Sequence, residues 1–238
     1  MILNAKELGY QKLNEVVREA SEDVIINECC GERFIGCGAA GKNITINGIP
    51  GNALGAYLDG ATITVNGNAQ DAVGDTMNDG RIIVNGNVGD ALGYAMRGGK
   101  ILIKDNSGYR TGIHMKQYKE KCPIIVVGGR TGSFLGEYLA GGTIIVLGLN
   151  CETVPLGNFT GTGMHGGEIW VRSAKEIANL PAQVSAKKAT KEELKRIKPY
   201  ITEYAELFGI DEQIIYGVQF YLLKPNAKNP YKQLYTEN

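Results

Sequence analysis

Short apolar segments recur along the chain at a fixed interval. Four of them begin at Ile44, Ile63, Ile82 and Ile101, each 19 residues after the one before. β-branched residues dominate these segments (ITI, ITV, IIV), and no helical period of 3.6 residues separates them. The pattern therefore predicts short strands joined by turns, without crossover helices.

The repeat extends beyond these four segments in both directions. Val24 (VIIN) begins a weaker early copy, and Ile124 (IIVVG), Ile144 (IIVLG) and Ile169 (IWV) begin later ones. About seven copies fill residues 24–171, and a fixed period near 20 residues is typical of solenoids, whose units stack on one another. We therefore predict an all-β fold, a right-handed parallel β-helix, with Ile and Val side chains stacked inside.

Glycine marks the turns between these segments. The chain has 33 glycines, about twice the average usage. Glycine adopts positive φ without a Cβ penalty, so a bend that recurs in every layer favours it. An apolar residue followed by glycine occurs once per turn, and a second glycine closes each turn. Structural turn glycines are predicted at Gly36, Gly55, Gly74, Gly93, Gly112, Gly136 and Gly163, and closing glycines at Gly41, Gly60, Gly80, Gly99, Gly142 and Gly167.

Asn-Gly pairs supply a further bend at 47–48, 66–67 and 85–86. Asn tolerates the left-handed region, and amide side chains in successive layers can hydrogen-bond to one another. We expect the Asn side chains to form a ladder along the stack.

The flanks differ from the repeats, and three parts are predicted: an N-terminal helical cap over 1–23, the β-helix over 24–172 and a helical and irregular extension over 173–238. Helical caps are expected because a stack of strands leaves a raw edge at each end. Residues 10–20 place Leu13, Val16, Val17 and Ala20 on one helical face.

The C-terminal extension carries its own helix signals. A capping box of Thr190 and Glu193 opens a helix over 190–208, which Pro199 interrupts. The final stretch, 217–238, holds a short strand-like run and is expected to fold back on the body or onto a partner.

Charge and composition exclude several classes of protein. Lys plus Arg equals Asp plus Glu, 25 against 25, so neither nucleic acid nor an anionic membrane is expected as a partner. No apolar run approaches the roughly 18 residues that span a bilayer, and the N-terminus lacks the order of a secretory signal. The five cysteines, an odd number, indicate reduced thiols. These features predict a cytoplasmic protein.

Candidate chemical groups are few, and each has a plain structural explanation. Cys29, Cys30 and Cys37 fit no zinc spacing and are expected as small apolar fillers. His114 and His165 follow the apolar-Gly pair in two different copies, but a whole copy lies between them, so we expect turn histidines rather than a catalytic pair.

Acidic residues give one further alternative. Asp71 and Asp90 occupy matching positions 19 apart, so stacking brings two carboxylates to about 5 Å from each other. Such pairs hold Ca²⁺ or act as acid and base in β-helix enzymes that cleave polysaccharides. A Ca²⁺-dependent polysaccharide enzyme therefore stays open as an alternative, against a solvated turn. Phosphate loops are disfavoured because a strand, not a helix, follows each glycine-rich turn.

Specific motifs within the turns resemble a known family. LGAYLDG, LGYAMRGG, LGEYLAGG and GMHGG, together with ERFIG after NECC, are similar to the GXGXG domain. This domain is the right-handed β-helix of the glutamate synthase large subunit and is shared with one of the subunits of formylmethanofuran dehydrogenase. The resemblance covers roughly residues 24–172.

The resemblance implies a scaffold rather than an enzyme. It implies a non-catalytic part of a glutamate synthase-like complex, which makes glutamate from glutamine and 2-oxoglutarate, with amidotransferase and FMN-containing synthase subunits as partners. FMN and iron–sulfur clusters are expected on those partners. The resemblance implies no catalytic, cofactor-binding or metal-ligating residue on this chain. The GXGXG-bearing subunit of formylmethanofuran dehydrogenase is the alternative within the family.

Overall fold

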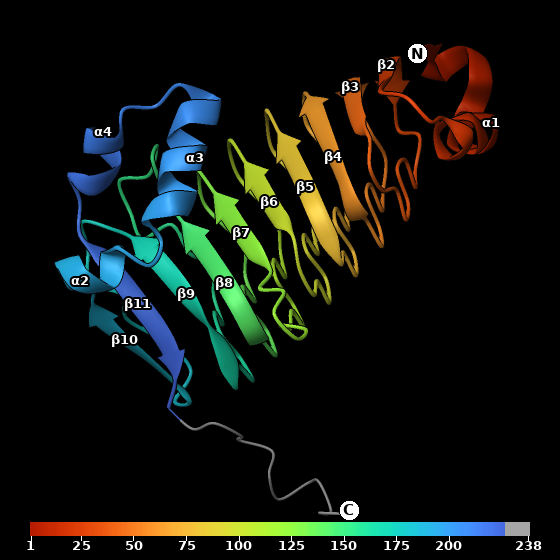
Figure 1. Ribbon diagram of the computed structural model, residues 1–238. Helices are drawn as coiled ribbons and strands as arrows, with labels where there is room; N and C mark the ends of the chain where they lie inside the picture. The colour runs from red at the N-terminus through yellow and green to blue at the C-terminus, as the bar shows by residue number, and fades with distance from the viewer. Residues whose placement is uncertain (227–238) are drawn as a thin grey trace, which may run out of the picture.

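A single large sheet dominates the computed structural model, which describes residues 1–226 of the 238-residue chain. The sheet has 11 strands in the order β1-β2-β3-β4-β5-β6-β7-β8-β9-β11-β10, laid side by side in an elongated row (Figure 1). The strands are β1 (Ile2–Asn4), β2 (Val24–Cys30), β3 (Asn43–Ile49), β4 (Asp59–Asn66), β5 (Asp79–Val84), β6 (Lys100–Ile103), β7 (Ile124–Val127), β8 (Ala140–Val146), β9 (Gly166–Arg172), β10 (Val184–Lys188) and β11 (Phe220–Pro225).

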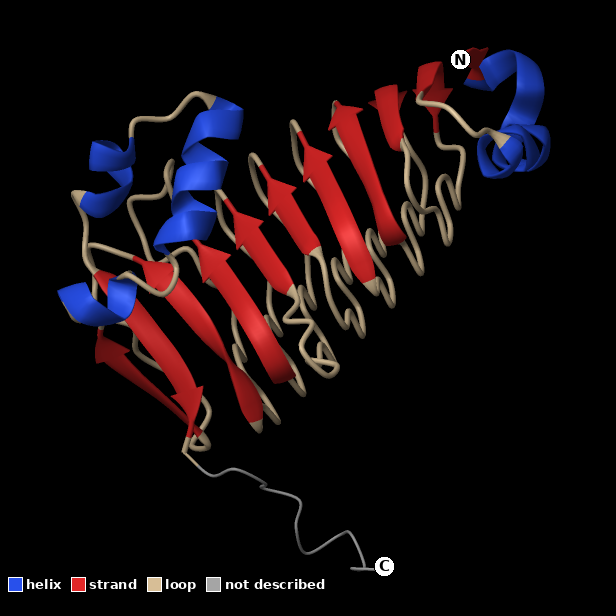
Figure 2. Cartoon of the chain, viewed as in Figure 1, coloured by secondary structure: helices blue, strands red, loops and turns tan. Residues whose placement is uncertain are grey.

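Four short helices lie at the two ends of this row (Figure 2). They are α1 (Ala5–Glu19), α2 (Lys191–Leu194), α3 (Lys198–Phe208) and α4 (Glu212–Tyr216). The sheet-rich architecture that the repeat predicted is confirmed.

Strands β1 to β9 pair in parallel, each with the next in the sequence. Ile44 pairs with Ile63, Ile63 with Ile82 and Ile82 with Ile101, as the 19-residue interval predicts. Val24 likewise pairs with Ile44, so the weak first copy belongs to the same series.

One predicted register is wrong by a single residue. Ile101 pairs with Ile125 rather than with Ile124, and Ile125 then pairs with Ile144. A shift of one residue moves every side chain of a strand to the other face. Ile124 therefore lies on the outer face, although the repeat predicted it inside. All four residues of β7 are buried, so alternation of apolar and polar positions does not mark the inner face there.

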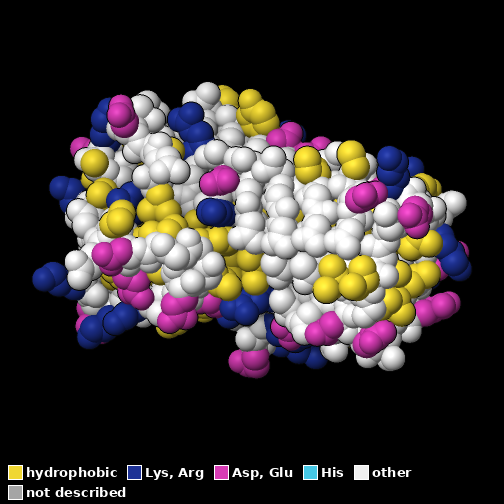
Figure 3. Space-filling view, turned by 90° about the horizontal axis from the view of Figure 1, so that it is seen from above, with side chains coloured by type: hydrophobic (Ala, Val, Ile, Leu, Met, Phe, Trp, Pro, Cys, Tyr) yellow, Lys and Arg dark blue, Asp and Glu magenta, His cyan; other side chains and the backbone are white. Residues whose placement is uncertain are grey.

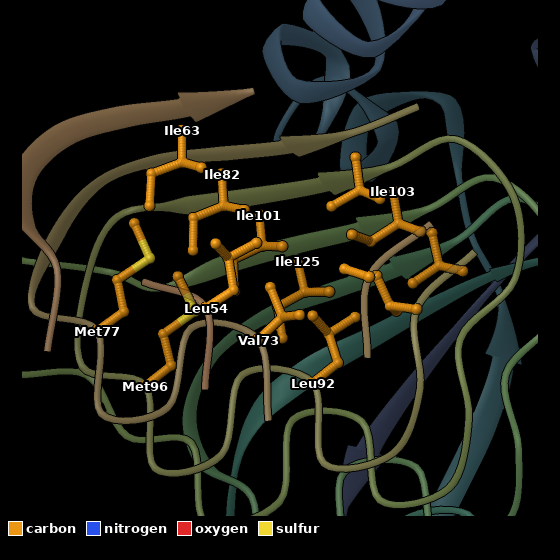
Figure 4. Packing of buried hydrophobic residues seen from close by; sticks show 14 of the residues in the cluster. Leu54, Ile63, Val73, Met77, Ile82, Leu92, Met96, Ile101, Ile103 and Ile125 are labelled. Carbon is orange, nitrogen blue, oxygen red and sulfur yellow. The ribbon is translucent and has the colours of Figure 1, made fainter. Parts of the chain in front are cut away.

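The main core lies on the inner face of the sheet. Ile63, Ile82, Ile101 and Ile125 follow one another from strand to strand, facing Leu54, Val73 and Leu92 of the turn segments (Figure 4). All seven are fully buried. Stacking like residues in successive layers gives a continuous apolar column.

Helix α1 covers the N-terminal end of this core. Its buried residues are Ala5, Leu13 and Val17, and Asn4 caps it by accepting a hydrogen bond from the Glu7 N–H at 3.3 Å. The helix begins five residues earlier than the predicted range 10–20 and bends at Gly9, whose φ of 68° is not helical. A short strand, β1, precedes it and extends the sheet by one parallel partner.

The C-terminal end is closed by two antiparallel strands. β11 pairs antiparallel with β9, and β10 pairs antiparallel with β11. Tyr221 and Leu223 of β11 join the inner core, whereas Phe220 and Leu222 face the other side. The strand-like run expected after residue 217 thus folds back on the body; the rest of that stretch, 227–238, lies outside the described residues.

Helices α2 to α4 cover the outer face of β5 to β9 with a second apolar core. The predicted capping box is present, because Thr190 and Glu193 exchange hydrogen bonds at the start of α2. Pro199 lies in the first turn of α3, so it helps to begin a second helix after a break rather than interrupting one helix. Trp170, the largest fully buried side chain within residues 1–226, belongs to this second core.

Polar contacts fasten these helices to the sheet. The Glu203 carboxylate of α3 accepts hydrogen bonds from Arg81 and from Lys100 Nζ, the latter at 2.7 Å. Burial raises the pKa of Glu203, but the hydrogen bonds from Lys100 and Arg81 outweigh it and leave the pKa below its usual value. The ion pair therefore favours the docked helix.

A buried arginine ties α4 to the sheet without a carboxylate. The Arg172 guanidinium donates to the carbonyl oxygens of Ile215 at 2.9 Å, Ile214 at 2.9 Å and Leu147 at 3.1 Å. Desolvation lowers the pKa of Arg172. Its fork of donors satisfies three backbone acceptors at the junction of α4 and β8.

The face at which the parallel strands end is poor in charge over its middle. Seen from above, much of it consists of backbone and uncharged polar side chains (Figure 3). The Asn-Gly pairs lie at these strand ends: Asn47-Gly48 near the end of β3, Asn66-Gly67 at the end of β4 and Asn85-Gly86 after β5. Within residues 1–226, no helix has the length and apolar character needed to cross a membrane.

Candidate interaction surface on the stacked turns

Each turn between parallel strands from β2 onward contains three residues with positive φ, spaced two apart. In the turn after β3 these are Ala53, Gly55 and Tyr57, with φ of 61°, 63° and 58°. The same triple recurs in every repeat, and we call its positions first, middle and third. The first position holds Phe34, Ala53, Ala72, Ala91, Arg110, Phe134 and Phe159, and the third holds Gly38, Tyr57, Thr76, Ala95, His114, Tyr138 and Gly163.

This left-handed triple lets each turn hydrogen-bond to both neighbouring turns. The Gly55 N–H donates back to the Ile35 carbonyl at 2.8 Å. The Ala53 N–H donates forward to the backbone carbonyl of Asp71 at 2.9 Å, and the Tyr57 N–H donates forward to that of Asp75 at 2.8 Å. Alternate donors thus point in opposite directions along the stack. The turns are linked by a backbone ladder of their own, although they are not strands.

The middle position requires glycine for two reasons. Its φ is positive, and a Cβ on Gly55 would lie 2.7 Å from Cδ1 of Ile82, well inside van der Waals contact. Gly36, Gly55, Gly74, Gly93, Gly112 and Gly136, six of the predicted turn glycines, all occupy this position.

The seventh predicted glycine is displaced by two residues. Gly161, not Gly163, occupies the middle position of the last turn: its N–H donates to the Leu135 carbonyl at 2.7 Å, and a Cβ there would lie 2.8 Å from Val184 Cγ2. Gly163 has a φ of 70° and occupies the third position instead. Thr160 precedes Gly161 and Thr162 precedes Gly163, so the residue before the glycine does not distinguish the two positions in the sequence.

Asparagine side chains form the predicted ladder beside the strands. Asn47 Nδ2 donates to Asn27 Oδ1 at 2.7 Å, Asn66 to Asn47 at 2.8 Å and Asn85 to Asn66 at 3.2 Å. A second ladder runs through Asn68, Asn87 and Asn106. Each layer is therefore held in register with the next by side chains as well as backbone.

Asp71 and Asp90 belong to a similar series. Asp71 Oδ1 accepts the Asp90 N–H at 2.8 Å, and Asp90 Oδ1 accepts the Tyr109 N–H at 2.8 Å. In the layer before, Asn52 accepts the Asp71 N–H at 3.2 Å. The matching acidic residues thus accept hydrogen bonds from the backbone of the following layer. Their 19-residue spacing is explained by these hydrogen bonds rather than by exposure to solvent.

The remaining candidates from the sequence are not brought together. Cys29 is buried, and burial raises the pKa of its thiol to about 12, whereas Cys30 and Cys37 are exposed. All five cysteines fall within the described residues and are free thiols. His114 occupies the third position of its turn, but His165 lies two residues beyond the third position of the last turn. Within residues 1–226, no group of three or more His, Cys, Asp or Glu side chains could hold a metal ion.

On the turns of the later repeats, large side chains contact one another. The His114 ring stacks on Tyr138, with centroids 5.0 Å apart and planes 5° apart, and Tyr94 meets His114 edge-on at 5.9 Å. In the first position, the Phe134 and Phe159 rings stack at 5.1 Å, and the Arg110 guanidinium lies 5.3 Å from the Phe134 ring centroid. We call these residues the aromatic surface: Tyr94, Arg110, His114, Phe134, Tyr138 and Phe159.

This surface was not predicted from the sequence. Written under one another, RTGIH, FLGEY and FTGTG show that five of the six residues two positions before or after the middle glycine are large, and four of them are aromatic. The apolar-Gly pair by itself does not reveal this signal. The direction in which these side chains point depends on the left-handed backbone, which periodicity does not reveal.

Comparison with known proteins agrees with this turn geometry. The family model of the GXGXG motif matches residues 11–219, which extends beyond the range 24–172. An uncharacterized protein of Methanocaldococcus jannaschii, MJ1350, is 41% identical over 251 residues, covering 99% of this chain and 96% of the relative.

A solved structure shares the fold. A chain of the formyltransferase/hydrolase complex FhcABCD of Methylorubrum extorquens, solved with methylofuran, superposes with a TM-score of 0.64 at 22% identity. The match covers 84% of this chain and 72% of that chain. With its glycine-centred turns and a match over most of its length, this chain belongs to the GXGXG motif family, whose domain occurs in glutamate synthase and in formylmethanofuran dehydrogenase.

Proposed function

We propose that the chain is a non-catalytic structural subunit that holds other subunits of a multi-subunit enzyme complex. The observation that supports this best is the pairing of a stiff, layered body with an exposed aromatic surface along one side of it. Bodies built from stacked repeats present extended surfaces for binding partners. The shared fold with a chain of FhcABCD, which is a multi-subunit complex, supports the same role.

The finer description of the fold is part of this proposal. We infer that the repeats form a right-handed parallel β-helix, each repeat making one coil. Parallel pairing from β1 to β9 and the ladder between turns support this description. Parallel connections are right-handed in nearly all known cases.

A complex of the formylmethanofuran dehydrogenase type is the assembly we favour. The solved chain that shares the fold comes from a complex that carries methylofuran, and the family includes a subunit of formylmethanofuran dehydrogenase. In such an assembly the reaction takes place on the other subunits, and this chain fixes their relative positions.

A glutamate synthase-like complex is the second candidate. The motifs LGAYLDG, LGYAMRGG and LGEYLAGG support it, because they resemble the β-helix of the glutamate synthase large subunit. The partners would then be amidotransferase and FMN-containing synthase subunits, with FMN and iron–sulfur clusters bound by those partners.

Purification of the native assembly separates the two candidates. The full chain, tagged and produced in its own organism, is isolated gently, and the accompanying subunits are identified by mass spectrometry together with bound metals and flavin. A partner with molybdenum or tungsten supports the first candidate. An amidotransferase with an FMN protein supports the second. A chain that elutes alone at cellular concentration overturns the structural role.

A further inference from the structure

Most residues of the aromatic surface have a backbone conformation that is unfavourable for any residue except glycine. Arg110, His114, Phe134, Tyr138 and Phe159 all have φ between 53° and 62°, a region that favours glycine. The third position accepts glycine in the first and last turns, where Gly38 and Gly163 stand. Large side chains at these positions are therefore retained at a cost in stability, and residues held in sparsely populated backbone regions cluster at functional sites.

The placement of large side chains is also uneven along the stack. The first position holds alanine in three successive turns, at Ala53, Ala72 and Ala91. The turn before these three holds Phe34, and the turns after them hold Arg110, Phe134 and Phe159 in chain order. The fold itself is satisfied by small residues in those three turns, so it does not require the large ones.

The surface is exposed and already ordered. Phe159 is 57% exposed and Tyr138 36%, although each ring stacks on its neighbour. Arg110 Nε donates to Glu137 Oε2 at 3.2 Å, which fixes the guanidinium beside Phe134. Rigid aromatic residues and arginine are the side chains most enriched at the centres of protein interfaces.

Cations flank the surface on both sides. Arg130 lies four residues before Phe134 and continues the series of Asn87 and Asn106. Its backbone N–H donates to Asn106 Oδ1 at 2.9 Å. On the other side, Arg97 and Lys116 occupy matching places in successive turns. The backbone N–H of Arg97 donates to the Met77 carbonyl at 2.8 Å, and that of Lys116 donates to the Met96 carbonyl at 3.0 Å, each in the layer before.

These flanking cations are available for a partner. Arg97, Lys116 and Arg130 are exposed, and none forms an ion pair with another residue of the described chain. Glu137 is engaged, since it accepts from Arg110, whereas Asp105 and Glu152 line the same pocket as Arg130. The surface therefore has an apolar, aromatic centre with positive charge at Arg97 and Lys116 on one side.

We propose that the aromatic surface is the recognition site for a partner protein whose contact face has an apolar centre and an acidic rim. The proposal rests on the structural role proposed above and specifies where the partner binds. Apolar contact with the stacked rings supplies the affinity, and Arg97 and Lys116 orient the approaching acidic rim.

Glycine substitutions test the proposal, because they remove the side chain and relieve the backbone at once. The probe is the partner protein recovered with the native chain, purified and titrated against full-length variants by calorimetry. Phe159→Gly and Tyr138→Gly should each raise Kd about tenfold or more, without lowering Tm. The matched controls Ala91→Gly and Ala95→Gly relieve the same first and third positions in an earlier turn, and should leave Kd within twofold.

Charge gives an independent measurement on the intact complex. Carbodiimide coupling should join Lys116 to carboxylates of the partner, whereas Lys6 of α1, which is exposed at the far end, should not be coupled to the same protein. Arg97→Ala should slow association and weaken its dependence on salt.

The outcomes separate this inference from the function on which it rests. If the partner binds both glycine variants with wild-type Kd and Lys116 is not coupled, the recognition site lies elsewhere, although the structural role stands. If no partner accompanies the native chain, both proposals fail. Tight binding of a nucleic acid or a polysaccharide at this surface, lost in Phe159→Gly, would replace the protein partner with a different ligand.

Discussion

A Cβ placed on Gly55 would lie 2.7 Å from Cδ1 of Ile82, which belongs to the second strand after that turn. The same relationship links Gly93 with Ile125 at 2.5 Å and Gly136 with Ile169 at 2.7 Å. The middle glycine thus makes room for an isoleucine two strands further on in six of the seven turns, and for Val184 in the last. This contact couples the turn pattern to the core of the sheet.

Gly55→Ala should destabilise the fold by more than a left-handed alanine alone. The backbone term is about 1–2 kcal/mol, and crowding against Ile82 adds about 1–3 kcal/mol. Gly41→Ala is the matched control, because Gly41 has a φ of 62° with nothing within 4 Å of an added Cβ. Denaturant unfolding measures both. Equal losses for the two variants would show that packing against Ile82 is unimportant.

Ile82→Val should be less costly in the Gly55→Ala background than in the wild type. Valine lacks the Cδ1 atom that the added methyl group meets, so the second change relieves part of the first. A double-mutant cycle of unfolding free energies gives the coupling, expected at about 0.5–1.5 kcal/mol. Simple additivity would contradict the contact.

Asp90→Ala should cost about 1 kcal/mol, because the Tyr109 N–H loses its acceptor. Asp90→Asn should be nearly neutral, since Asn52, two layers before Asp90 in the same series, accepts the Asp71 N–H in the same way. Thermal unfolding with Ca²⁺ and with chelator distinguishes this role from a metal site. A rise in Tm with Ca²⁺ that Asp71→Asn and Asp90→Asn abolish would instead support the polysaccharide-enzyme alternative.

Acid should release α3 from the sheet. The pKa of Glu203 is lower in the folded protein than its ordinary value of 4.5, so its ion pairs with Lys100 and Arg81 stabilise the fold above that pH. The contribution is lost as the pH falls below 4.5 and through the folded-state pKa. Trp170, the single tryptophan, lies buried beneath these helices, so its fluorescence reports the change. Glu203→Gln should flatten this part of the pH profile; an unchanged profile would assign the acid sensitivity to other carboxylates, such as Glu168.

Arg172→Lys should loosen α4 even though the charge is kept. A lysine ammonium cannot reproduce the guanidinium fork that reaches the carbonyls of Leu147, Ile214 and Ile215. We expect a loss of about 2–3 kcal/mol and faster hydrogen exchange over 212–217. Arg196→Lys, at an exposed arginine on the same side, is the control and should change exchange there little. Protection of 212–217 equal to the wild type would contradict the role of Arg172.

The sequence by itself determined the repeat, its parallel pairing and the glycine at the bend. Ile44, Ile63, Ile82 and Ile101 were predicted in the correct register because a strict 19-residue interval separates them, and in β3 and β4 alternation also marks the inner face. The asparagine ladder followed for the same reason, since a strict 19-residue interval places like residues in adjacent layers.

Only the tertiary structure decided the register of β7, the position of Gly161 and the aromatic surface. Helices α2 to α4 bury the outer face of β5 to β9, so both faces are apolar there and the pattern cannot distinguish Ile124 from Ile125. The three left-handed residues of each turn direct its alternate side chains toward the core or away from it. No hydrophobic period encodes that choice. Contacts between residues 24 or 25 positions apart, such as Arg110 with Phe134 and Phe134 with Phe159, exist only because the layers stack.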